Sequence, residues 1–224
     1  MKNNSGLWNA TCGEIGATLK VLQDQGLTLE DLALLRSNKD LAKKVAEVIK
    51  ATNGVPKVIK KESKILNLLS GSEKIILSRL DGRTKISQAK NVFKAYISSD
   101  FENLGLNKKS KSTPKTEVEI YEIAKNANFK DMFTSLSDDL DFLCLTQSQI
   151  IDFCEKHRSH LRQVGYATLF LTKKDFEKPA TEDNLFVVGV GVGSDGLGVD
   201  VSRFGRAHVW SADARRRVVV SKLS

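Results

Sequence analysis

Three residues with metal-binding and nucleophilic side chains, Cys154, His157 and His160, follow one another at intervals of three. Thiolate and imidazole are ligands that zinc prefers, and a cysteine beside a histidine can act as a nucleophile. The apolar pattern around them predicts a helix, and steps of three drift around a helix axis, so His160 leaves the face that carries Cys154 and His157. Because a zinc site needs about four converging ligands, we expect a core cysteine and a boundary histidine, with neither a metal nor a catalytic site.

Gly191, Gly193 and Gly196 match the G-x-G-x-x-G pattern of dinucleotide-binding loops. That site needs a helix to begin at the third glycine, so that its amides meet the pyrophosphate. Here Val199 and Val201 alternate with polar residues, which predicts that the chain continues as a strand. We therefore expect no cofactor, and we interpret the glycines as a sheet face that a helix or an aromatic ring crosses closely.

Arginine and aromatic residues are interleaved between Arg203 and Arg217. The aromatic residues include Phe204 and Trp210, and the arginines are Arg203, Arg206, Arg215, Arg216 and Arg217. Proteins that bind single-stranded nucleic acid use such residues on a sheet for stacking and phosphate contacts. A charged edge strand that resists aggregation has a similar composition, and we favour this structural interpretation.

The basic charge is concentrated in one segment. The 224 residues carry a formal net charge of +8, and residues 56–116 contain 14 Lys and Arg against 5 Asp and Glu, whereas residues 117–164 contain 5 against 9. The basic segment can attract a phosphate backbone by counterion release, dock on the acidic segment, or keep the protein soluble, and we favour the last two. The candidate nucleic-acid contacts in it are Lys57, Lys60, Lys61, Lys64, Lys85, Lys90 and Lys94.

The elements that would position these residues are mainly helical before about Gly165. Thr28 with Asp31, and Ser37 with Asp40, predict two N-caps that open successive helices. Such a pair is compatible with a helix-turn-helix, but its nearly neutral surface lacks a cluster of side chains suited to base edges. Further helices are predicted over residues 14–25, 57–80, 85–98 and 117–127, with a strand as the alternative for 74–80.

Two acidic groups and one capping box complete the helical part. The carboxylates at 117–122 and 138–141 fall in the first turns of predicted helices, where they complement the helix dipole. Thr146 with Gln149 predicts a capping box for a helix that ends near Leu161. None of these groups predicts a metal site.

Strand-like alternation replaces the helical spacing after Gly165. Strands are predicted over residues 166–172, 185–192, 197–204, 207–211 and 218–220. The sequence thus predicts an α+β protein, with a helical N-terminal part followed by helices packed on a small antiparallel β-meander. Residues 1–106 would form the helical region, residues 107–116 a basic linker or loop, and residues 117–224 an α+β domain.

Cysteine usage and hydropathy bear on the compartment. Cys12, Cys144 and Cys154 lack the spacing of a disulfide framework and are interpreted as reduced core thiols. The first residues lack the apolar run of a secretory signal. The apolar stretch at 185–193 is shorter than the roughly 20 residues that cross a bilayer. We expect a cytoplasmic protein with no membrane partner.

Several short runs in the second half of the chain carry a resemblance: LCLTQSQIIDFC at 143–154, GYAT at 165–168, RF at 203–204, VW at 209–210 and RRRVVV at 215–220. Over most of residues 117–220 the chain resembles a family of uncharacterised bacterial proteins of similar size. The resemblance implies a bacterial cytoplasmic source and no assigned activity. The glycine-rich strand at 189–193 departs from the family's more β-branched pattern.

Three functional hypotheses remain. The first is a non-enzymatic interaction or accessory protein with a protein partner. The second is a nucleic-acid-binding protein that uses the basic helical segment or the Arg-rich sheet edge. The third is an enzyme with a site near His157, His208 and Asp213. We favour the first hypothesis, with the second as the alternative.

Overall fold

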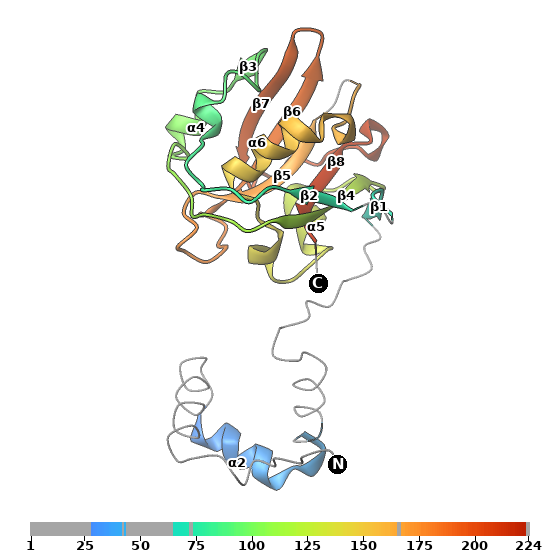
Figure 1. The fold of residues 1–224 in the computed structure, drawn as a ribbon. Coiled ribbons are helices and arrows are strands. Elements are labelled where there is room, and N and C mark those ends of the chain that lie inside the picture. Colours follow the sequence, from blue (N-terminus) through green and yellow to red (C-terminus); the bar gives the residue numbers. More distant parts are fainter. Residues whose placement is uncertain (1–27, 42, 44–64, 72–73, 165–166, 223–224) are drawn as a thin grey trace, which may run out of the picture. The chain divides into compact units, whose positions relative to one another are not determined.

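The structure, a computed structural model, describes residues 28–41, 43, 65–71, 74–164 and 167–222 (Figure 1). Contacts divide the chain into two compact units, Met1–Lys57 and Val58–Ser224. Among the described residues, no helix has the length and apolar character needed to cross a lipid bilayer. The predicted helix 14–25, most of the second helix of the predicted hairpin, and Lys57, Lys60, Lys61 and Lys64 lie outside the described residues.

In the first unit, helix α2 (Leu29–Ser37) begins where the sequence predicts. The Thr28 hydroxyl accepts a hydrogen bond from the Asp31 N–H at 3.2 Å, and the Asp31 carboxylate accepts one from the Thr28 N–H at 2.8 Å. This confirms the first capping box. The second predicted cap is wrong, because the Ser37 hydroxyl donates back into α2 and Asn38 Oδ1 accepts from the Leu41 N–H at 3.0 Å.

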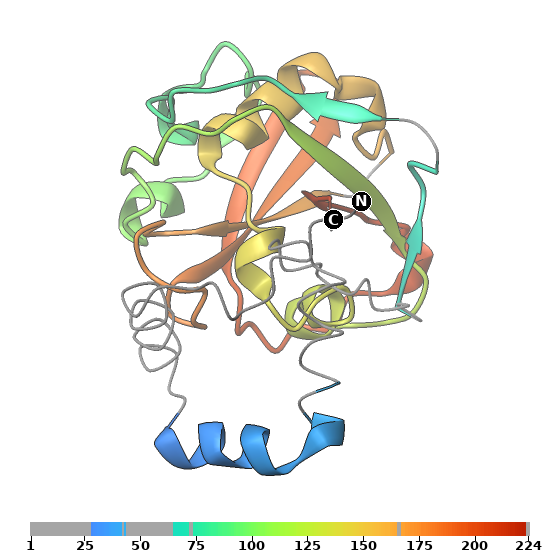
Figure 2. The same cartoon turned by 60° about the horizontal axis from the view of Figure 1, so that its bottom comes forward.

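The second unit is built on one mixed sheet (Figures 1 and 2). In space its strands follow the order β1-β4-β8-β5-β6-β7-β3, and β2 also pairs with β4. The pairs β5/β8 and β3/β7 are parallel, and the other pairs are antiparallel. The eight strands are β1 (Leu66–Leu68), β2 (Ile75–Leu77), β3 (Tyr96–Ile97), β4 (Thr116–Ile123), β5 (Thr168–Lys173), β6 (Leu185–Gly193), β7 (Gly196–Arg203) and β8 (Arg217–Ser221).

Few helices accompany this sheet. They are α4 (Asp100–Asn103), α5 (Phe129–Thr134) and α6 (Gln147–Lys156), with short 3-10 helices η2 (Ile86–Gln88), η3 (Leu140–Leu143), η4 (Arg158–His160) and η5 (Ala212–Ala214). The predicted α+β fold with a helical front and a small antiparallel meander is therefore wrong. Residues 66–97 contribute three strands to a larger mixed sheet, and the predicted linker 107–116 lies within the second unit, between α4 and β4.

In the described residues, the predicted helices at 65–80, 85–98 and 117–127 are corrected to strands and loops with the short η2, and β4 shows why. Both faces of the sheet are covered at this strand, so apolar residues occur on both sides and the expected alternation is blurred. Val118 and Ile120 are buried in one core, whereas Tyr121 and Ile123 are buried in the other. Glu119, expected in a helical first turn, is instead buried and accepts a hydrogen bond from the Tyr121 hydroxyl at 2.6 Å.

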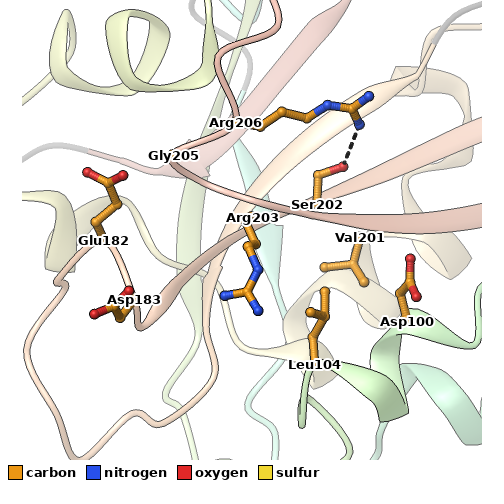
Figure 3. Close-up of a pocket in the computed structure, with 9 residues that line it drawn as sticks. All are labelled: Asp100, Leu104, Glu182, Asp183, Val201, Ser202, Arg203, Gly205 and Arg206. Atoms are coloured by element: carbon orange, nitrogen blue, oxygen red, sulfur yellow. Dashed lines mark hydrogen bonds between the residues drawn. The ribbon is translucent and has the colours of Figure 1, made fainter.

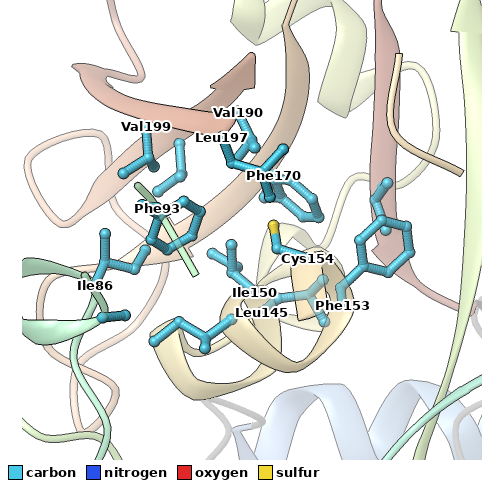
Figure 4. Close-up of a cluster of buried hydrophobic side chains, with 14 of the residues drawn as sticks. Ile86, Phe93, Leu145, Ile150, Phe153, Cys154, Phe170, Val190, Leu197 and Val199 are labelled. Carbon is cyan, nitrogen blue, oxygen red and sulfur yellow. The ribbon is translucent and has the colours of Figure 1, made fainter. Parts of the chain in front are cut away.

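Two hydrophobic cores lie on opposite faces of the sheet. The first lies between the sheet and α6, where the Phe153 and Phe170 rings meet edge to face with their centroids 5.4 Å apart (Figure 4). Cys154 belongs to this core, as the sequence predicts. The second core lies beneath α5 and η3 and includes Phe129 and Phe133. Each fully buried phenylalanine contributes about 1.5–3 kcal/mol of burial free energy.

Polar side chains of α6 fix the segments before β4 to this helix. The capping box of Thr146 and Gln149 is confirmed. The Ser148 hydroxyl donates to the Thr84 carbonyl at 3.0 Å, and the Gln149 amide donates to the Thr116 hydroxyl at 3.0 Å. The helix ends at Lys156, before the predicted end at Leu161, and η4 comes directly after it.

The C-terminal strands agree better with the sequence. The hairpin of β6 and β7 turns at Ser194 and Asp195, as predicted, and β8 covers the predicted strand 218–220. The chain remains in strand conformation after Gly196, so no helix begins at the third glycine of the G-x-G-x-x-G pattern. Residues 207–211 form only an isolated bridge, between Trp210 and Ala127.

Candidate functional site

In the described part of the second unit, one face of the sheet is left uncovered beside the second core. At the start of β6, Leu185 and Val187 are buried in that core, but the next residues on the same face are glycines. Directly paired residues of β6 and β7 share this face, and they are Gly189 with Asp200, Gly191 with Gly198 and Gly193 with Gly196. Among the described residues, no heavy atom lies within 4 Å of a Cβ added to Gly191. The backbones of two strands therefore form an open floor.

Two adjoining cavities of about 440 and 390 Å³ lie over this floor and share Ala167 and Asp200. We call them together the glycine groove. Tyr96 of β3 lines one of them with 54% of its surface exposed, and a Cβ on Gly198 would lie 3.6 Å from the Tyr96 Cβ. This contact is the one between directly paired residues of β3 and β7, so it does not show the predicted crossing of the glycine face by a ring or helix.

The other cavity of the groove is lined by Trp210 and Arg216. The guanidinium carbon of Arg216 lies 4.2 Å from the centroid of the Trp210 ring. The Trp210 ring is held from two further sides, by His208 at 4.3 Å and by Phe129 at 5.5 Å between centroids. Its backbone pairs with Ala127 in both directions, at 2.9 and 3.2 Å. This arginine and this tryptophan therefore form a fixed, stacked pair.

A third cavity of about 460 Å³ adjoins the groove at the edge of β7 (Figure 3). It shares four lining residues with the groove, among them Ser202 and Arg206, whose Nη1 donates to the Ser202 hydroxyl at 3.3 Å. Figure 3 shows the Arg203 guanidinium in the space between Asp183 and Leu104. Arginines thus lie along both sides of the last residues of β7.

Four carboxylates oppose these arginines, and two of them, Glu182 and Asp183, line the third cavity with Arg203. Asp100, at the start of α4, and Asp200, on β7, both line the groove. Burial raises the pKa of Asp200 above its ordinary value of 3.8, and the negative charge of Asp100 raises it further. In the groove itself, Arg206 and Arg216 are balanced by two carboxylates, so this surface can hold both an anionic group and a hydrogen-bond donor.

The structure separates the five predicted arginines. Arg203, Arg206 and Arg216 line the connected cavities. Arg217 lies on the opposite face of β8, where its Nη1 donates to the His160 carbonyl at 2.6 Å and to the Leu161 carbonyl at 3.2 Å. Arg215 is exposed in a left-handed turn with φ of 47° and does not line the groove.

The described lysines of the predicted basic surface are not on a helix. Lys85 is the N-cap of η2, and Lys90 and Lys94 lie exposed in the loop that leads to β3. The Lys94 Cβ would lie 3.2 Å from a Cβ on Gly196, which places Lys94 beside the β6–β7 hairpin. Trp210 belongs to the predicted block of arginines and aromatic residues, whereas Tyr96 was missed because only its pairing with Gly198 brings it to the groove.

The residues considered for metal or nucleophile chemistry have other contacts in the structure. Cys154 is buried, and burial raises the pKa of its thiol. His157 is the C-cap of α6, with Nε2 3.3 Å from the Ile76 carbonyl. His208 instead meets the Trp210 ring edge to face, and Asp213 accepts a hydrogen bond from Ser211. Within the described residues, no group of three or more His, Cys, Asp and Glu is arranged to hold a metal ion.

Comparisons with protein-family models, with curated proteins and with solved structures give no match. A function for this chain must therefore be inferred from the geometry of the groove.

Proposed function

We propose that the glycine groove binds single-stranded nucleic acid. The observation that carries this proposal is the Arg216–Trp210 pair beside an open sheet floor. Single-strand binders combine aromatic rings and arginine guanidinium planes, on which bases stack, with cations that follow the backbone, and a base stacked on an aromatic residue contributes about 1–3 kcal/mol. Because Arg216, His208 and Phe129 already contact the Trp210 ring, a base would stack on the Arg216 guanidinium that this ring supports. Tyr96 offers an exposed ring over the same floor.

Glycines make this floor suitable for flat groups. A base or ribose approaching Gly191 meets strand backbone without an intervening side chain. Arg203, Arg206 and Arg216 place guanidinium groups along the connected cavities, among the carboxylates of Asp100, Glu182, Asp183 and Asp200. A duplex would bury its base faces within the helix and could not use the aromatic rings, so we expect preference for single strands.

The carboxylates of the groove oppose the binding of an anionic strand. Asp100 and Asp200 line the same cavity as Arg206 and Arg216 and repel phosphates there. Their presence limits the electrostatic part of the affinity. If about three arginines neutralise phosphates, the logarithm of the binding constant should fall against the logarithm of salt concentration with a slope of about −2.

The test is fluorescence anisotropy of labelled oligo(dT) and oligo(U), with a duplex for comparison, over a salt series. We expect the double variant Arg206→Gln/Arg216→Gln to bind at least about tenfold more weakly, because each charge-assisted contact contributes about 1.5–3 kcal/mol. The matched control is Arg215→Gln/Lys130→Gln, which removes the same charge from exposed positions outside the groove. Equal weakening in the two double variants, or stronger binding of the duplex, would contradict the proposal.

Trp210→Leu separates stacking from charge. It keeps the net charge and should weaken binding by about 1–3 kcal/mol with an unchanged salt slope. The melting temperature of each variant without ligand shows whether the fold is retained.

A further inference from the structure

A separate cavity of about 300 Å³ is lined by lysines and shares no lining residue with the glycine groove or the cavity beside it. We call it the lysine pocket. Two segments form it, the loop that precedes β4 and the end of β5 with the residues after it. Its charged lining residues are Lys108, Lys109, Lys111, Lys173, Lys174, Asp175 and Glu177.

The loop that precedes β4 carries Lys108, Lys109 and Lys111. Hydrogen bonds hold the backbone of this loop against α6 and the segment near Gly82. The buried Gln147 amide at the start of α6 donates to the Leu106 carbonyl and accepts from the Ile86 N–H at 3.0 Å. The Ser110 N–H donates to the Gly82 carbonyl at 3.0 Å. Gly82 has φ of 74°, and a Cβ there would lie 2.3 Å from the Lys111 carbonyl oxygen. The three lysines of this loop are thus held near one another by a backbone whose position is fixed.

Charge pairing inside the pocket is incomplete. Lys173 is buried, forms an ion pair with Asp141 and donates to the Lys178 carbonyl at 2.9 Å, so its charge is already compensated. In the described part of the chain, the other four lysines of the pocket form no ion pair. Against them stand Asp175 and Glu177, and Asp175 already lies 4.0 Å from Lys178 Nζ. The pocket therefore has an excess of about two positive charges.

The facing segment is also well ordered by its own contacts. The buried Asn184 side chain donates to the carbonyls of Asp175 and Pro179 at 2.9 and 3.0 Å, and Asn184 Oδ1 accepts from the Asp175 N–H at 2.9 Å. The Lys174 side chain lies against Gly105. A Cβ added to Gly105 would lie 2.9 Å from the Lys174 Nζ. Phe176 supplies one apolar wall of the pocket. Both sides of the pocket are thus formed before a ligand arrives.

We propose that the lysine pocket binds a phosphate dianion, either inorganic phosphate or the phosphate group of a small organic monoester. Phosphate carries a charge of about −1.5 to −2 near neutral pH, which matches the excess of the pocket. Lysine is a common phosphate ligand because its ammonium offers three donors. Phe176 would contact the organic part of a monoester. This site is independent of nucleic-acid binding in the glycine groove.

The test uses isothermal titration calorimetry with inorganic phosphate and with phenyl phosphate, at constant ionic strength maintained with chloride. We expect saturable binding of both probes to the wild-type protein, with phenyl phosphate the tighter. Lys109→Gln/Lys174→Gln should weaken both by at least about tenfold, since two charge-assisted hydrogen bonds are removed.

The matched control is Lys125→Gln/Lys130→Gln, which removes two exposed lysines outside the pocket. It should bind phosphate within about twofold of wild type, because only long-range charge is lost. Equal weakening in the two double variants, or heats that do not exceed those of chloride, would overturn the proposal. Sulfate as a competitor at equal affinity would overturn the assignment to phosphate. The melting temperature without ligand confirms that each variant is folded.

Discussion

The carboxylate of Asp152 on α6 accepts a hydrogen bond of 2.8 Å from the backbone N–H of Ser78, which comes directly after β2 and lies 74 residues earlier. Lys156, one turn further along α6, lies 2.5 Å from the same carboxylate and donates to the Ser78 hydroxyl at 2.5 Å. The Asp152 side chain is only 5% exposed. A single buried carboxylate therefore joins the helix to the end of a strand.

Asp152→Asn should destabilise the protein by about 2 kcal/mol near neutral pH, because a hydrogen bond to a charged group contributes about 1.5–3 kcal/mol. Burial raises the pKa of Asp152, but the Lys156 and Ser78 contacts outweigh burial and lower it below 3.8. A depressed folded pKa gives stability that is present above the unfolded value and lost as pH falls through the folded value. The difference between wild type and variant, measured by urea unfolding, should therefore be constant above about pH 5 and shrink below about pH 4. The exposed Asp183→Asn is the control, and a difference that stays constant in acid would contradict this account.

Gln147 gives a second prediction, because both ends of its buried amide are used by other segments. Gln147→Leu leaves the Leu106 carbonyl and the Ile86 N–H without their partner and should cost about 3 kcal/mol, since each buried unsatisfied group costs about 1–3 kcal/mol. Gln147→Glu keeps the shape but places a carboxylate oxygen against the Leu106 carbonyl. We expect the Glu variant to recover stability relative to wild type between pH 7 and pH 5, because protonation restores a donor. Urea unfolding at both pH values measures this, and equal losses at the two would count against it.

The glycines provide a third prediction, in which two similar substitutions have opposite effects. Gly191→Ala places a methyl group in open space, so stability should be unchanged or rise by about 0.5 kcal/mol from reduced unfolded-state entropy. Gly82→Ala requires a side chain at φ of 74° and 2.3 Å from the Lys111 carbonyl oxygen, and should cost more than about 2 kcal/mol. Thermal melts of the two variants test this. A loss for Gly191→Ala as large as for Gly82→Ala would show that the groove floor is covered.

Local signals in the sequence predict the local structure well. The capping boxes at Thr28 and Thr146 and the hairpin of β6 and β7 depend on residues a few positions apart, and the structure confirms them. The strands β1 and β4 could not be predicted in this way, whereas β2 lies within the segment 74–80 for which a strand is the alternative. The pairing partners of β1 and β4 are distant, as when Val118 pairs with Ser221, and tertiary pairing overrides the helix propensity of the glutamates in β4.

The sequence predicts some residues of the candidate site but not how they come together, for a related reason. The cluster of arginines is visible in the sequence, but the register of β8 decides which of these arginines reach the groove. Arg216 and Arg217 are neighbours on opposite faces, and only Arg216 reaches the groove. Asp100 enters the groove from α4, about a hundred residues before Asp200, and only the fold brings the two together.

The cysteines give a fourth prediction. Burial raises the pKa of both Cys144 and Cys154, and the Cys144 thiol also donates to the Leu140 carbonyl at 3.2 Å. Because the thiolate is the reactive species, both should be alkylated by N-ethylmaleimide far more slowly in the native protein than in urea. Cys154, the more buried of the two, should be the slower. Mass spectrometry of peptides reads each cysteine separately, and native labelling as fast as in urea would refute the burial of that thiol.

Asp200 gives the last prediction, which concerns the pH dependence of binding in the glycine groove. Its carboxylate faces the same cavity as Arg206 and Arg216 and repels phosphates there. Since burial and the charge of Asp100 raise its pKa, the carboxylate begins to protonate at a higher pH than an ordinary aspartate. Wild-type binding of oligo(dT), whose bases do not take up protons in this range, should therefore tighten as the pH falls from 7 towards 5.

Asp200→Asn isolates this effect. The variant should bind oligo(dT) about threefold to tenfold more tightly at pH 7, which corresponds to about 0.7–1.4 kcal/mol, and its affinity should depend less on pH than that of the wild type. His208 is present in both proteins, so any contribution of its imidazole cancels in the comparison. Anisotropy titrations at pH 7 and pH 5 give the four binding constants required. Equal affinities at pH 7 would mean that Asp200 does not face the phosphates. Weaker binding by the variant at pH 7 would instead mean that the carboxylate accepts a hydrogen bond from the base.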